Sequence, residues 1–174
     1  FQNFLYLSSY HLNEKMMNKY ISLLEEWKPR FIAAYPFSAY TLANHLYRRG
    51  KVLQVDAVFT SSETLYPGLR EKIEHAFQCK VIDNYGLGEP GLFYSGECCP
   101  GNMRISSDIS YIEIVDKSGN VLKPGVSGEI VQTCFHNYSM PFIRYKTGDV
   151  GVIGSATCQC DSNFPVFKKI IGRT

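Results

Sequence analysis

The chain has 174 residues, a normal length for one domain or for two small subdomains that share a core. A chain of this length buries roughly 70% of its unfolded surface, so it needs no disulfides or metals to fold. Its 18 basic and 16 acidic residues are too balanced to indicate nucleic acid or an anionic membrane as a partner. No apolar run approaches the roughly 20 residues that span a bilayer, and no signal peptide is visible. We therefore expect a cytoplasmic location.

The first half of the sequence alternates helical and strand-like segments. In HLNEKMMNKYISLLEEWKPR the apolar residues recur at helical spacing, with Asn13 as the expected N-cap and Pro29 as the end of the helix. A short buried strand is expected over 31–35. A helix over 38–49 follows, and Gly50 stands where a C-terminal glycine is typical.

The same alternation continues along the chain. A strand is expected over 55–60, a helix beginning at Pro67, and another strand over 80–85. This order predicts an α/β fold with a mixed or parallel sheet and flanking helices. Ligands of such sheets bind at the carboxyl ends of the strands. Two segments leave predicted strand ends, the run 60–64 (TSSET) and the run 84–94 (NYGLGEPGLFY).

The run 84–94 places an aromatic ring, two glycines and a carboxylate within five residues. Two glycines and a proline disfavour a helix, and glycine weakens a strand, so we expect a loop. Tyr85 is suited to stack on a flat base. Glu89 is suited to hold Mg²⁺, which prefers one or two carboxylates together with phosphate oxygens. The alternative is a solvated glutamate beside a tyrosine at the edge of the core.

The pattern changes after about residue 95. Short alternating runs such as SYIEIVD and GEIVQTC are separated by glycine-rich turns, and helical periodicity is absent. We expect a smaller, antiparallel, barrel-like subdomain here. The predicted division is an α/β subdomain over 1–98 and a β-rich subdomain over 99–174.

Asp149 follows Gly148 in the run IRYKTGDVG. A carboxylate at such a turn can accept hydrogen bonds from the two adjacent hydroxyls of a ribose, each worth about 1.5–3 kcal/mol. The alternative is an aspartate that merely forms the turn.

The six cysteines include two close pairs, GECCPG and TCQCDS. Cys98, Cys99, Cys158 and Cys160 could form a tetrahedral thiolate site of the kind that zinc favours. Buried thiols without a metal are one alternative. A disulfide is the other, and it would need an oxidising compartment.

The motifs together resemble the adenylate-forming enzymes. Those that carry the resemblance are FTSSETLYPGLREKIEHAFQCKVIDNYGLGE, then GEIVQT, MPFIRYKTGD and KKIIGR. Their order and spacing are most similar to the branch that holds phenylacetate–coenzyme A ligase and the CapK proteins of capsular polysaccharide biosynthesis. The resemblance extends over essentially the whole chain.

The resemblance implies a nucleotide site. Ser61, Ser62 and Glu63 would line its adenine side, and Tyr85 would stack near the adenine in a loop shaped by Gly86 and Gly88. Glu89 would ligate Mg²⁺, Asp149 would bind the ribose, and Arg173 would lie near the ribose and the developing charge. Gly88 stands where the family usually has Thr or Ser, so one hydroxyl contact to phosphate is absent.

The resemblance also implies a zinc site. Cys99-Pro100 and the pair Cys158 and Cys160 match a metal-binding pair of the CapK-like branch. The family often has a His a few residues after the Cys-Pro, where this chain has Arg104. Cys98 is the expected substitute ligand.

The function implied is that of an ATP-dependent carboxylate-activating ligase. It would use ATP and Mg²⁺, with coenzyme A as co-substrate, to convert a small carboxylic acid through its acyl-adenylate. The family's upstream phosphate loop and downstream catalytic-lysine lid have no counterpart here, so we expect a central part of a larger enzyme, inactive by itself. The alternative is a non-catalytic, zinc-stabilised binding module derived from the same fold.

Overall fold

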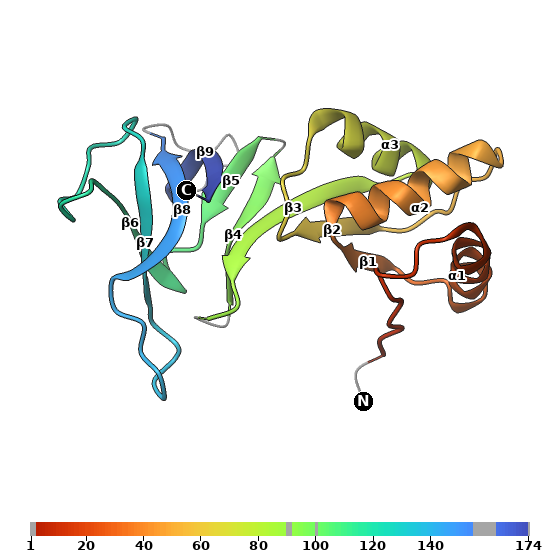
Figure 1. Cartoon of the computed structure of the whole chain (residues 1–174), viewed down its shortest axis with the longest axis horizontal. Helices are drawn as coiled ribbons and strands as arrows, with labels where there is room; N and C mark the ends of the chain where they lie inside the picture. The colour runs from red at the N-terminus through yellow and green to blue at the C-terminus, as the bar shows by residue number, and fades with distance from the viewer. Residues whose placement is uncertain (1–2, 90–91, 100, 155–162, 174) are drawn as a thin grey trace. The chain divides into compact units, whose positions relative to one another are not determined.

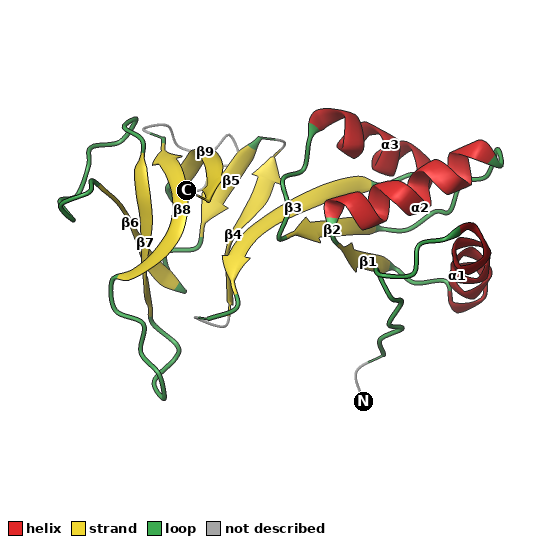
Figure 2. Cartoon of the chain, viewed as in Figure 1, coloured by secondary structure: helices red, strands yellow, loops and turns green. Residues whose placement is uncertain are grey.

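The computed structural model describes residues 3–89, 92–99, 101–154 and 163–173, and for 92–94 only the backbone. The chain divides into two compact units, Phe1–Ile82 and Asp83–Thr174. Within the described residues all helices belong to the first unit, and the second is built of strands and turns (Figure 2). The sequence indicated a similar change in character, with its boundary predicted between residues 98 and 99.

The first unit contains the helices that the sequence predicts. In chain order its elements are α1 (Glu14–Trp27), β1 (Phe31–Ala34), α2 (Pro36–Arg48), β2 (Ala57–Ser61) and α3 (Pro67–Phe77), followed by the start of β3 (Lys80–Leu87). Asn13 caps α1, because its side chain accepts a hydrogen bond from the Met16 amide at 3.0 Å. Helix α2 begins two residues earlier than expected because Pro36 occupies its first turn, where a proline fits without losing a hydrogen bond. None of the described helices has the length and apolarity that crossing a bilayer requires.

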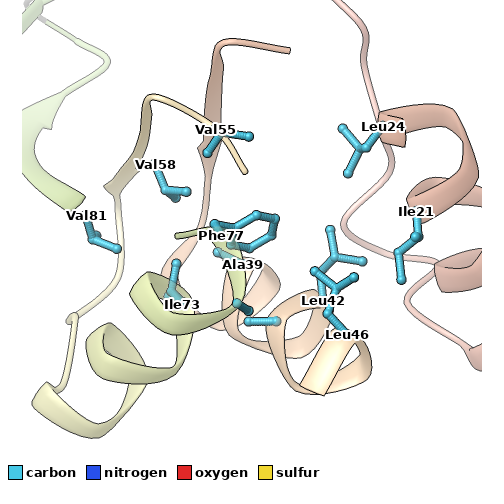
Figure 3. Close-up of a cluster of buried hydrophobic side chains, with 12 residues drawn as sticks. Ile21, Leu24, Ala39, Leu42, Leu46, Val55, Val58, Ile73, Phe77 and Val81 are labelled. Carbon is cyan, nitrogen blue, oxygen red and sulfur yellow. The ribbon is translucent and has the colours of Figure 1, made fainter. Parts of the chain in front are cut away.

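Strands β1 and β2 are parallel and are joined through α2, as the α/β prediction requires (Figure 1). The strand order in this unit is β1-β2-β3. Buried apolar side chains from all three helices meet those of β2, β3 and the segment before β2, with Phe77 among them (Figure 3). The helix positions involved recur every three or four residues, which is why the sequence pattern locates them.

We expect Phe77→Ala to destabilise the chain by about 3–5 kcal/mol, the usual cost of removing a fully buried ring. Phe77 is 0% exposed and packs among the other core side chains, so its loss leaves a cavity. The free energy of unfolding in urea measures this. Phe4→Ala is the matched control, since Phe4 is 62% exposed. An equal effect of the two substitutions would contradict the assigned core.

His45 is a buried polar residue of this unit. Its Nε2 lies 2.7 Å from Oδ1 of Asn18 in α1, and because an amide oxygen only accepts, Nε2 must carry the hydrogen. Burial lowers the pKa of His45 below its ordinary value of 6.5, the positive charge of Arg49 lowers it further, and the negative charge of Glu14 opposes them more than Arg48 adds to the lowering. The folded chain therefore favours the neutral ring.

This shift predicts a loss of stability on acidification. As pH falls below 6.5 the unfolded chain binds a proton that folded His45 resists, so the free energy of unfolding declines until pH reaches the lowered folded pKa. Above 6.5 both states are neutral at this residue and its contribution to stability is complete. Denaturation at a series of pH values should show a shallower decline in His45→Gln. An equal decline in the wild type and in His45→Gln would contradict the lowered pKa of His45.

The second unit is an antiparallel sheet. After β3, which spans the boundary, come β4 (Leu92–Cys99), β5 (Asn102–Ile105), β6 (Ser110–Val115), β7 (Gly128–Cys134), β8 (Tyr145–Ile153) and β9 (Val166–Arg173). The described pairs are antiparallel, in the order β3-β4-β5-β9-β8-β7-β6. The α/β class and the antiparallel second part are confirmed. The order is open over the described residues, so barrel closure stays a prediction.

The segment around Tyr85 differs from the expected loop. Strand β3 continues through Leu87 and forms an antiparallel pair with β4, in which Tyr85 lies opposite Ser95. The register shifts between Tyr85 and Gly86, and such a bulge is where a strand tolerates a glycine. The prediction that glycine excludes a strand here was therefore wrong, because it treated the cost of one glycine as decisive against pairing with β4.

Candidate functional site

The carboxylate of Asp149 is the centre of a polar cluster inside the second unit. Asp149 is buried in β8, and its Oδ2 accepts a hydrogen bond of 2.7 Å from the Tyr85 hydroxyl. Its Oδ1 lies 3.5 Å from Nε of Arg173. The phenol and the guanidinium compensate part of the cost of burying the charge. Three residues predicted from distant parts of the sequence thus meet at one carboxylate.

Strand pairing explains this convergence. Arg173 of β9 is the register partner of Asp149 in β8, which places the two side chains next to each other. Tyr85 comes from β3, and its ring makes an edge-on contact with Phe167 of β9 at a centroid distance of 5.8 Å. Phe167 is itself part of the apolar core of this unit. The tyrosine ring therefore has an apolar support, while its hydroxyl reaches the carboxylate.

Glu89 follows the end of β3 and is exposed. Its Oε1 accepts a hydrogen bond of 3.4 Å from the Tyr145 hydroxyl at the start of β8. In β8 the alternate residues Thr147, Asp149 and Gly151 are buried. Tyr145 lies two residues before Thr147 and so belongs to the same inward-facing side of the strand. A carboxylate oxygen is the kind of ligand that Mg²⁺ prefers, and the magnesium role of Glu89 stays a prediction.

Ser61, Ser62 and Glu63 lie in the first unit, at and just beyond the end of β2. Ser62 has φ of +71°, a left-handed conformation that is uncommon for a residue with a side chain. The two serine hydroxyl oxygens are 3.4 Å apart. Glu63 accepts a hydrogen bond of 3.1 Å from the Phe37 amide in the first turn of α2, and so caps that helix. The sequence did not indicate this structural role for Glu63.

A cavity of about 730 Å³ opens at the same place in the first unit. Its volume lies within the range typical of small-molecule sites. Its lining comes from the segment before α1, the start of α2, and the loop after β2, and consists of Ser9, Tyr10, His11, Leu12, Asn13, Tyr35, Phe37, Ser38, Thr41 and Glu63. The rings of Tyr10, Tyr35 and Phe37 are largely exposed and belong to this cavity rather than to the core.

The predicted zinc ligands are only partly within the described residues. Cys98 and Cys99 end β4, where the register with β5 shifts, and the Cys98 thiol donates to the Asn102 carbonyl at 3.5 Å. Cys158 and Cys160 lie outside the described residues. In the part of the chain that is described, no three His, Cys, Asp or Glu side chains converge as a metal site would require. The zinc site stays a prediction.

Two residues of the second-unit cluster were not singled out from the sequence. Tyr145 and Thr147 precede Asp149 by four and two residues. The Tyr145 hydroxyl donates to Glu89, and the Thr147 hydroxyl accepts from the Asp149 amide. The period of two in a strand places all three on one face of β8. That alternation was present in the sequence, but the glycine before Asp149 indicated a turn instead.

Comparison with solved structures defines the class of fold. The chain matches an open conformation of 2-hydroxyisobutyryl-CoA ligase in complex with 2-HIB-AMP and CoA, with a TM-score of 0.78 over 92% of this chain and 37% of that one, at 23% identity. A long-chain-fatty-acid-CoA ligase from Archaeoglobus fulgidus matches with a TM-score of 0.65 over 89% of this chain and 37% of that one, at 18% identity. The fold is that of the adenylate-forming coenzyme A ligases.

Curated proteins of that class are similar to the chain in sequence. Phenylacetate–coenzyme A ligase of Thermus thermophilus is 29% identical over 91% of this chain and 37% of its own length. Protein CapK of Staphylococcus aureus is 27% identical over 98% of this chain and 37% of its own. The predicted relationship to the phenylacetate–coenzyme A ligase and CapK branch is confirmed. The chain spans about a third of the length of these relatives, and no protein-family model matches it.

Proposed function

We propose that the protein carrying these residues activates a small carboxylic acid with ATP. In the first step a carboxylate oxygen attacks the α-phosphorus of ATP, the bond to the β-phosphate breaks, and pyrophosphate leaves. In the second step a thiol of the coenzyme A type attacks the carbonyl carbon of the acyl-adenylate, and AMP leaves. The observation that carries the proposal is the meeting of Tyr85 and Arg173 at Asp149.

The second unit is proposed to hold the nucleoside. Asp149 accepts hydrogen bonds from the two ribose hydroxyls, because a carboxylate has four lone-pair positions and its present partners use only some of them. The ring of Tyr85 stacks on the adenine, with Gly86 and Gly88 allowing the backbone to come close. Arg173, whose side chain is 73% exposed, is free to turn toward the negative charge that develops on the phosphate.

Two further roles are carried over from the resemblance. Glu89 is the residue proposed to hold Mg²⁺, which when bound neutralises phosphate charge during the displacement. For Ser61, Ser62 and Glu63 of the first unit, contact with the adenine stays a prediction from the resemblance. The names of the relatives support a coenzyme A thiol as acceptor.

The test is exchange of labelled pyrophosphate into ATP by the natural protein, as its gene encodes it, with a panel of aryl and aliphatic carboxylic acids. Exchange that depends on one of the acids supports the proposal, since it requires reversible adenylate formation. Direct titration with ATP should show binding without any acid. If no acid supports exchange and ATP does not bind, the proposal fails.

A further inference from the structure

Strand β8 is irregular directly before Asp149. In its pairing with β7, Glu129 lies opposite Val150 and Val131 lies opposite Lys146. Only Ile130 of β7 therefore lies between these pairs, whereas β8 has three residues there, Thr147 to Asp149. Gly148 supplies the left-handed conformation that the extra length needs, with φ of +74°. The strand bulges where it presents the proposed ribose-binding carboxylate.

A bulge removes ladder hydrogen bonds, and the Thr147 side chain replaces them. Its hydroxyl donates to the Ile130 carbonyl at 2.8 Å, which ties the bulge to the facing strand. The same oxygen accepts the Asp149 amide hydrogen at 3.0 Å. Thr147 is buried, as are both of its partners, so water does not offer an easy substitute for either bond.

We propose that Thr147 is a positioning residue for the carboxylate of Asp149. The hydroxyl fixes the backbone of Asp149 relative to the core residue Ile130, and this sets where the carboxylate points. With that backbone held, the carboxylate reaches the Tyr85 hydroxyl and the Arg173 guanidinium at once. The inference rests on the proposed function, because it assigns Thr147 to recognition of the ribose through Asp149.

Substituting Thr147 by valine or by serine distinguishes the contribution of its hydroxyl from that of its shape. Thr147→Val keeps the volume and the branching at Cβ but can neither donate to Ile130 nor accept from Asp149. Thr147→Ser keeps the hydroxyl and loses only a methyl group. A role in positioning therefore predicts that serine rescues what valine loses, whereas a role in packing alone predicts the reverse.

The experiment measures dissociation constants of ATP and 2′-deoxy-ATP for the natural protein and its variants by calorimetry. The wild type should prefer ATP, because Asp149 contacts both ribose hydroxyls. Thr147→Val should weaken ATP binding about tenfold, as expected for loss of about one hydrogen bond. It should weaken 2′-deoxy-ATP binding less, so that the preference for ATP falls severalfold. Thr147→Ser should restore the preference.

Two further variants distinguish failure of the positioning role of Thr147 from failure of the proposed function. In an Asp149→Ala background, Thr147→Val should not change the preference again, because the residue through which it acts is gone. If Thr147→Val fails to fold, Thr147→Ala removes the hydroxyl without crowding and replaces it in the same comparison. An unchanged preference in the folded variant overturns the positioning role while leaving the proposed function intact. A wild type that binds no ATP overturns both.

Discussion

Asp149→Ala should lower kcat/KM for ATP in pyrophosphate exchange at least about 100-fold. The substitution removes the acceptor of two hydrogen bonds from the ribose, and bonds to a charged group are worth about 1.5–3 kcal/mol each. Together they amount to at least about 3 kcal/mol, and every 1.4 kcal/mol is a factor of ten. Asp149→Asn should lie between the alanine variant and the wild type, because the amide keeps one acceptor oxygen but turns a donor toward the second hydroxyl.

The control for Asp149 must separate binding from folding. Asp108→Ala is the matched substitution, since Asp108 is an exposed aspartate of the same unit and lies outside the cluster. It should leave the exchange rate unchanged. Thermal unfolding of Asp149→Ala should accompany the kinetics, because the variant also leaves the Arg173 and Tyr85 groups without their carboxylate partner. A folded Asp149→Ala protein that exchanges pyrophosphate at the wild-type rate would exclude the proposed nucleotide site.

The elements of the first unit could be predicted because their signals are local. A capping side chain at Asn13 and prolines at the first turns of α2 and α3 determine the starts of the helices. Apolar residues at intervals of three and four identify the buried faces. The start of α2 was predicted two residues too late, because Pro36 was not recognised as the first residue of the helix.

The cluster around Asp149 was not available from local signals. The hydrogen bond from Tyr85 joins residues 64 positions apart, and it depends on the order and register of several strands. The local sequence around Asp149 left two interpretations open, a ribose-binding carboxylate and an aspartate that forms a turn, and it indicated neither Tyr85 nor Arg173 as a neighbour. The resemblance to the adenylate-forming enzymes supplied the nucleotide roles of Tyr85, Asp149 and Arg173. The structure shows that the three side chains contact one another, and their roles stay predictions. The bulge and the Thr147 hydroxyl that supports it required coordinates.

For Glu63 of the first unit, the structure shows a role that the resemblance did not predict. Glu63 was assigned to the adenine side by resemblance, and its one described bond is to the amide of Phe37 at the start of α2. A carboxylate that caps a helix can still shape a ligand site, because it fixes the loop that carries Ser61 and Ser62. The left-handed Ser62 in that loop is the kind of strain that accumulates near ligand sites. The assignment of Glu63 to the adenine side of a nucleotide site therefore stays a prediction, and the conformation of its loop is a reason to test it.

Tyr85 allows its ring and its hydroxyl to be tested separately. The ring is proposed to stack on adenine, and removing an aromatic platform costs about 1–3 kcal/mol per base. The hydroxyl bonds Asp149 at 2.7 Å and so contributes to the folded structure of the second unit. We expect Tyr85→Ala to weaken ATP binding by about 5- to 150-fold, which corresponds to that range of free energy. We expect Tyr85→Phe to keep ATP binding within a few fold.

The stability of the folded chain should depend on the hydroxyl as well as on the ring. Tyr85→Phe loses a hydrogen bond to a carboxylate and should lower the free energy of unfolding by about 1.5–3 kcal/mol, although it retains the ring contact with Phe167. Fluorescence titration with ATP and urea unfolding of the same preparations measure the two effects. Tyr138→Ala, at a tyrosine that is 87% exposed, controls for loss of a ring elsewhere in the unit. Equal losses of ATP affinity in Tyr85→Phe and Tyr85→Ala would show that the hydroxyl, not stacking, is what the nucleotide needs.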